Sequence, residues 1–88
     1  MSEVTIEAFV SIPPCSGGVA VKRLLKEIEA EYGDRVEIRF HTGPDDPAWE
    51  VYAITNAPGL VVGDLVKFVG LAPSKDSLVG ALREAGLA

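Results

Sequence analysis

The sequence predicts one α/β domain in which four strands form a mixed sheet with helices on both faces. Three observations support this fold class. Two segments with strand-type alternation enclose a segment of 3.6-residue apolar period, which indicates a parallel strand–helix–strand unit. Two further apolar segments flank a Gly-Asp pair, which predicts an antiparallel hairpin. The 88 residues contain no repeat or linker, so a single domain over residues 1–88 is expected.

The first half of the chain supplies the parallel unit. Thr5–Ser11 alternates and is rich in β-branched and aromatic residues, so it predicts a strand that ends before Pro13-Pro14. Val36–Phe40 alternates strictly and predicts the second strand. The helix between them follows the turn at Cys15–Gly18 and ends at Gly33, which accepts a left-handed cap. Its apolar face consists of Val21, Leu24, Leu25, Ile28 and Tyr32.

A short second helix is expected after the turn at Gly43–Asp45. Asp46 is suited to cap its free amides, and Pro47 fits its first position. The helix is expected to continue to about Ile54, with Trp49 and Tyr52 on one face. These two aromatic residues and Phe40 are interpreted as core residues.

The last third predicts a hairpin and a helix, completing the order βαβαββα. Leu60–Val62 and Leu65–Val69 are short strands around Gly63-Asp64. Ser74 is expected to cap the last helix. Gly80 lies inside that helix, where it is expected to provide room for close packing.

Composition and charge exclude several classes of function. Thirteen acidic residues against eight basic ones give a net charge of −5, which argues against nucleic-acid binding. Apolar stretches are too short for a membrane span, and no signal peptide is visible, so a cytoplasmic location is expected. One cysteine and one histidine exclude an internal disulfide and a four-ligand zinc site.

Cys15 is the main candidate for chemistry. It precedes a helix N-terminus, where free amides and the helix dipole stabilise a thiolate and lower the thiol pKa below about 8.5. No Lys or Arg lies between Ser2 and Val21, so only a moderate depression is expected. The alternative is a small buried residue, although the Pro-Pro-Cys-Ser-Gly-Gly setting favours an accessible thiol.

Two other titratable residues, His41 and Glu7, are candidates for a role in chemistry. No acid or thiol lies near His41 in the sequence, so His41 is expected to be a surface or strand-end histidine and not a catalytic base. Glu7 alternates with apolar residues in a central strand, which makes it a weak candidate for a buried carboxylate that assists the thiol.

The element order, with a cysteine after the first strand and a proline before the third, resembles the thioredoxin fold. The likeness is closest to small thioredoxin- and glutaredoxin-like redox proteins, and is strongest over Thr55–Gly70 and Ala72–Lys75. The resemblance implies that Cys15 is the nucleophile and that Pro58 has a cis peptide bond and faces it. It also implies that the backbone of Ala57 meets an incoming peptide or disulfide. The expected site therefore consists of the catalytic residue Cys15 and three substrate-binding residues, Pro14, Ala57 and Pro58.

The chain departs from this family at Gly18, where the second, resolving cysteine of the redox motif would stand. The leading interpretation is therefore exchange through one thiol, with a protein disulfide or a low-molecular-weight thiol as partner. The alternative is a non-catalytic module that binds a partner protein. A shared iron–sulfur cluster is disfavoured because the residues typical of monothiol glutaredoxins are absent, so no cofactor is expected. A monomer is expected, with a Cys15-linked dimer left open.

Overall fold

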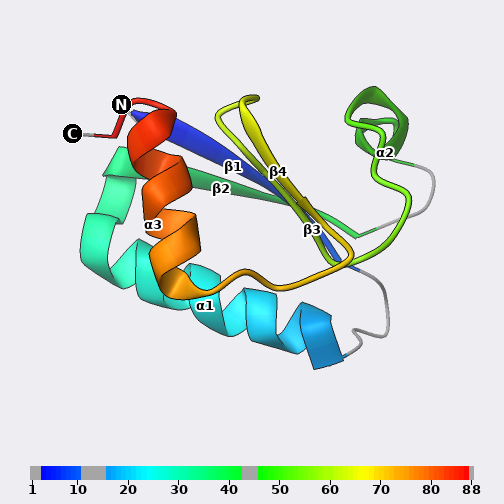
Figure 1. The fold of residues 1–88 in the computed structure, drawn as a ribbon, viewed down its shortest axis with the longest axis horizontal. Helices are drawn as coiled ribbons and strands as arrows, with labels where there is room; N and C mark the ends of the chain where they lie inside the picture. Colours follow the sequence, from blue (N-terminus) through cyan, green and yellow to red (C-terminus); the bar gives the residue numbers. More distant parts are fainter. Residues whose placement is uncertain (1–2, 11–15, 43–45, 88) are drawn as a thin grey trace.

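The computed structural model describes residues 3–10, 16–42 and 46–87 and has the element order βαβαββα, with one added 3₁₀ turn (Figure 1). The four strands form one sheet in the order β2-β1-β3-β4. The elements are β1 (Val4–Phe9), α1 (Ser16–Tyr32), η1 (Gly33–Arg35), β2 (Val36–His41), α2 (Ala48–Val51), β3 (Gly59–Val62), β4 (Val66–Val69) and α3 (Lys75–Glu84).

The sheet is mixed, as the sequence predicts. β1 pairs in parallel with β2 and antiparallel with β3, and β3 pairs antiparallel with β4. β1 is therefore a central strand, whereas β2 and β4 form the edges. Two register pairs bear on function: Phe9 lies opposite His41 on β2 and opposite Gly59 on β3.

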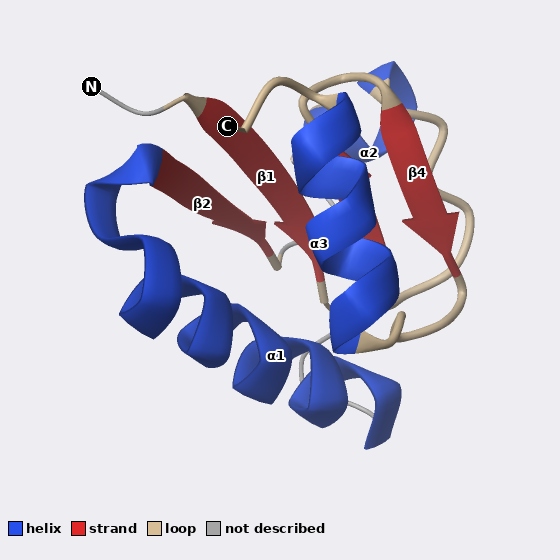
Figure 2. Ribbon diagram, turned by 60° about the vertical axis from the view of Figure 1, so that its left-hand side comes forward, coloured by secondary structure: helices blue, strands red, loops and turns tan. Residues whose placement is uncertain are grey.

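The main core lies between the sheet and the helices α1 and α3, which cover the same face (Figure 2). Alternate residues of β1 point into this core, which is why Ile6 and Ala8 are completely buried. The apolar stripe of α1 meets them, as its 3.6-residue period predicts. α3 contributes its buried residues Leu78, Ala81 and Leu82.

The opposite face of the sheet carries α2 and a smaller cluster. Phe9, Ile54 and Val61 are buried there, and Trp49 and Tyr52 pack against them. Helices thus lie on both faces, and Trp49 in α2 and Tyr52 directly after it pack against this core, as expected. The indole ring of Trp49 meets the ring of Phe9 edge-on, with 5.2 Å between the ring centroids.

α2 is shorter than the sequence predicts. It ends at Val51 instead of reaching Ile54, because Ala53 adopts a left-handed conformation with φ 55°. The amide of Ile54 then donates to the carbonyl of Trp49 at 2.8 Å, which is the closing hydrogen bond of a Schellman-type helix end. Without glycine at that position, the sequence carries no local signal for this ending.

The predicted turns and caps are present. Gly63 and Asp64 both have positive φ, 58° and 57°, as a type I′ hairpin turn requires. Gly33 ends α1 with φ 56°. Ser74 caps α3 by accepting a hydrogen bond from the amide of Ser77 at 3.2 Å. The expectation for Gly80 is wrong, since an added Cβ would meet no atom within 4 Å and the glycine is exposed.

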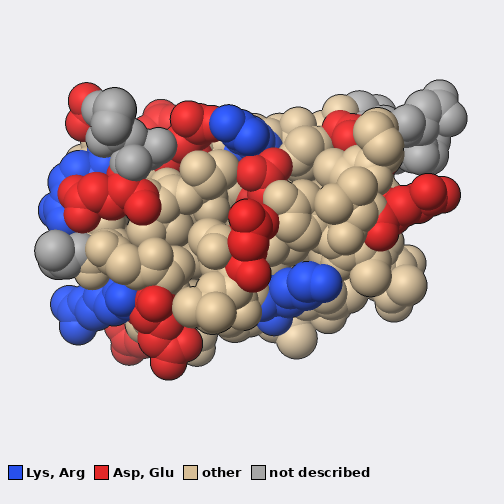
Figure 3. All heavy atoms as spheres, turned by 90° about the horizontal axis from the view of Figure 1, so that it is seen from above, with Lys and Arg blue, Asp and Glu red and all other residues tan. Residues whose placement is uncertain are grey.

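Acidic and basic side chains are mingled on the face of the molecule seen in Figure 3. Arg35 pairs with Glu3 at 2.7 Å, and Arg39 pairs with Glu37. Lys75 on α3 pairs with Glu31 on α1 and so connects the two helices of the main core. None of the described helices is long and apolar enough to cross a membrane.

Candidate functional site

The segment before β3 forms one side of the candidate site. The Ala57–Pro58 peptide bond is cis. Pro58 is buried, and Ala57 is partly exposed. The carbonyl of Pro58 accepts a hydrogen bond from the amide of Gly70 at 2.9 Å, which joins this segment to the end of β4. The sheet therefore holds Pro58 in place while Ala57 remains accessible.

The other side is the N-terminal end of α1. The helix begins at Ser16, and its first turn contains no acidic residue. The first amides of any helix lack a carbonyl partner within that helix, so this end favours a negative charge. Gly18, at the position of the missing second cysteine, is buried in this turn.

The sheet register places the end of β1 beside the cis-proline segment. Phe9, the last residue of β1, lies opposite Gly59, the residue that follows Pro58. The chain leaves β1 here and returns as α1 at Ser16, so the connection to α1 starts beside the cis-proline segment (Figure 1). Pro14 and Cys15 lie in this connection, outside the described residues. Their predicted roles, including the position of Cys15 opposite Pro58, stay predictions.

A second polar site lies on the α2 face of the sheet and is centred on His41. Its Nε2 atom lies 2.7 Å from Oε1 of Glu7, and its Nδ1 atom lies 2.6 Å from Oδ2 of Asp46. The His41 side chain is only 16% exposed and that of Glu7 only 9%. The imidazole ring also stacks on the ring of Phe9, with 4.8 Å between the centroids.

This geometry fits a positively charged imidazole. A neutral imidazole has one N–H donor, whereas both of its nitrogens here face carboxylate oxygens. Burial lowers the pKa of His41, but the hydrogen bonds to Glu7 and Asp46 outweigh it and place the pKa above 6.5. Arg39 lies 3.9 Å from the other oxygen of Glu7 and adds positive charge.

Asp46 connects this histidine to α2. Its Oδ1 atom accepts a hydrogen bond from the amide of Ala48 at 2.9 Å, while its other oxygen contacts His41. The Ala48 amide and His41 both lower the pKa of Asp46 below its usual 3.8. The predicted capping role of Asp46 is thus present, together with a contact to the sheet that the sequence pattern did not indicate.

His41 is the last residue of β2, as expected, but its side chain is largely buried and does not lie on the surface. The in-register parallel pairing places Glu7 opposite Arg39 and Phe9 opposite His41, so Glu7 and His41 lie on one face of the sheet. Glu7 is buried, as its place in a central strand suggested, and its described partners are His41 and Arg39. The sequence does carry a signal for this contact: an acidic residue and a histidine lie on two strands that are predicted to pair in parallel.

The core assignment of Phe40 is also wrong, since 49% of the residue is exposed. Coverage by α1 decreases along β2: Val36 is buried, Ile38 is partly exposed and Phe40 is half exposed. Strand alternation predicts the face on which a residue lies, but how far the helix above that face extends depends on tertiary packing.

Comparisons with known proteins agree with the fold. No protein-family profile matches the sequence. The chain is 36% identical over 85 residues to a protein named thioredoxin from Methanocaldococcus jannaschii, covering 96% of this chain and 98% of that protein. Among solved structures, reduced MJ0307 in solution is 30% identical, has a TM-score of 0.57 and matches over 96% of this chain and 98% of its own.

A further structure, of a malarial protein, covers 98% of this chain and all of its own with a TM-score of 0.81. At 11% identity, that likeness concerns the fold alone. The architecture and these relatives define the class as a small α/β protein of thioredoxin fold. The chain belongs to the thioredoxin family.

Proposed function

We propose that this protein catalyses thiol–disulfide exchange through the single thiol of Cys15. One observation carries the proposal: in a chain of the thioredoxin family, the sole cysteine immediately precedes Ser16, the first residue of α1. Unpaired amides at that helix end favour a thiolate, which is the nucleophilic form of cysteine.

The reaction needs two external thiols for each disulfide that is reduced. The Cys15 thiolate attacks one sulfur of the substrate disulfide, forms a mixed disulfide and releases the first substrate thiolate. A low-molecular-weight thiolate attacks the Cys15 sulfur and releases the second substrate thiolate. Another such thiolate attacks the resulting adduct, regenerates the Cys15 thiolate and leaves as an external disulfide. Gly18 carries no sulfur, so the protein does not resolve the mixed disulfide itself.

Ala57 and Pro58 are proposed to bind the substrate backbone beside the thiol. Ala57 is partly exposed, whereas Pro58 is buried and joined to Gly70. Pro14 is proposed to border the same site from the connection that follows β1. The proposed partners are protein disulfides or low-molecular-weight thiols. The protein is proposed to act as a monomer in the cytoplasm.

Disulfide reduction measured with insulin and excess glutathione tests the proposal. The protein should accelerate turnover above the glutathione background, and Cys15→Ser should remove the acceleration completely. Ser16→Ala, a neighbouring change that keeps the thiol, is the matched control and should retain most of the rate. Equal rates for the original protein and Cys15→Ser would contradict thiol exchange.

Non-catalytic binding of a partner protein is a second candidate function. The absence of a second thiol at Gly18 favours it, as do exposed apolar residues next to the cis-proline segment. Leu71, which follows the Gly70 partner of Pro58, is 52% exposed. In this case, Cys15→Ser should leave affinity for a captured partner unchanged, whereas Leu71→Asp should weaken it.

A further inference from the structure

A groove between α1 and the edge strand β2 is a surface feature that the proposed function does not use. Its volume is about 520 Å³, within the range typical of small-molecule sites. Ile38 and Phe40 line it from β2, and Leu25 lines it from α1. β1 separates β2 from β3, so the groove lies away from the cis-proline segment.

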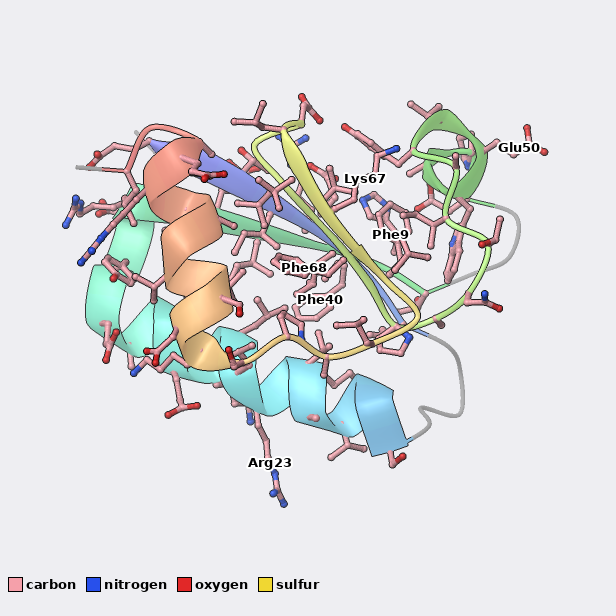
Figure 4. All side chains as sticks on the ribbon, in the orientation of Figure 1. Phe9, Arg23, Phe40, Glu50, Lys67 and Phe68 are labelled. Atoms are coloured by element: carbon pink, nitrogen blue, oxygen red, sulfur yellow. The ribbon has the colours of Figure 1, made fainter. Side chains whose placement is uncertain are left out.

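The floor of the groove is apolar and incompletely covered. Phe40 is 49% exposed although the aligned residue Val36, at the other end of β2, is buried. Figure 4 shows Phe40 in the space between the sheet and α1. A half-exposed aromatic ring in a concave site gains free energy when an apolar group covers it.

The rim of the groove is positively charged. Lys22, Lys26 and Glu29 line it, at spacings that place them on one side of α1. Two ammonium groups and one carboxylate give a local charge of +1, in a protein whose net charge is −5. Within residues 3–10, 16–42 and 46–87, neither lysine has a hydrogen bond or ion pair, whereas Lys67 and Lys75 each have a partner.

We propose that this groove binds a small amphiphile with an apolar body and one carboxylate. The apolar body would cover Phe40 and Ile38, and the carboxylate would lie between the ammonium groups of Lys22 and Lys26. The two lysines lie one helical turn apart, which suits one compact anionic head. Glu29 and the acidic net charge disfavour a broad anionic surface such as a membrane. This site does not depend on the Cys15 thiol.

Decanoate, kept below its micellar concentration, is the probe, and amide chemical shifts from NMR of the Cys15→Ser protein are the measurement. Saturable shifts should be confined to residues 22–29 and 38–42. Decan-1-ol has the same chain without the charge, and it should bind more weakly. Shifts centred on residues 57–60, or equal affinity for the alcohol, would overturn the proposal.

Four variants test the charge and the floor separately. Lys26→Gln should raise the Kd for decanoate about two- to fivefold, and Glu29→Gln should lower it by a similar factor. Arg23→Gln is the matched control, because Arg23 directly follows Lys22 in the sequence but its side chain points away from the fold (Figure 4). Phe40→Ala should weaken binding about tenfold. An effect of Arg23→Gln equal to that of Lys26→Gln would show diffuse electrostatic attraction and overturn the site.

Discussion

His41 shows how one residue can connect two parts of this fold. It joins Glu7 in the central strand to Asp46, which in turn accepts a hydrogen bond from the amide of Ala48 in α2. The contact with Glu7 is the more buried of the two, and a hydrogen bond to a charged group contributes about 1.5–3 kcal/mol. The short helix α2, which has only four residues, thus depends on side-chain contacts for its position.

Replacing His41 should destabilise the protein, because the carboxylates of Glu7 and Asp46 would lose their shared partner. We expect His41→Leu to lower the free energy of unfolding by about 2 kcal/mol, because buried Glu7 loses a charged donor. The double variant His41→Leu with Glu7→Leu should lose less than the sum of the two single changes. Urea unfolding of the four proteins in this cycle measures the coupling, and strict additivity would contradict a direct interaction.

Most of the elements follow from local signals, but the end of α2 does not. Alternation predicts β1 and β2, and the Gly63-Asp64 pair predicts the hairpin, because these signals depend on neighbouring residues alone. The end of α2 depends instead on the left-handed conformation of Ala53. The site divides in the same way: the cis bond before Pro58 follows from a sequence resemblance, whereas the His41 contacts require the register of two strands that α1 separates in the sequence.

Within α3, the exposed glycine Gly80 offers a direct test of helix propensity. We expect Gly80→Ala to raise the free energy of unfolding by about 0.5–1 kcal/mol, since the added methyl group meets no neighbour within 4 Å. Gly33→Ala is the opposite control, because φ 56° disfavours a side chain and should cost about 1 kcal/mol. Thermal unfolding by circular dichroism compares the two, and destabilisation by Gly80→Ala would contradict the open environment described.

At the scale of the whole molecule, stability should vary with pH through the His41 contacts. The folded-state pKa of His41 lies above 6.5, so its pairing stabilises the fold fully below pH 6.5 and loses effect as pH rises through that pKa. The pKa of Asp46 lies below 3.8, so its contribution is present above pH 3.8 and is lost as pH falls through the folded-state value.

The stability gap between the original protein and His41→Leu should therefore narrow as pH rises. Urea unfolding at intervals from pH 5 to about pH 9 measures this gap, in a range where ordinary carboxylates stay ionised. A gap that is constant over the whole range would show that His41 acts by packing on Phe9 alone.

The layers packed on the two faces of the sheet can be followed by different spectroscopic signals. Trp49 is the sole tryptophan and packs against Phe9 on the α2 side, whereas α1 and α3 on the other side account for most of the helical residues. Indole fluorescence thus senses detachment of α2, and far-ultraviolet dichroism senses loss of the larger helical layer. An experimenter can follow both layers in one unlabelled sample and learn whether they come apart together.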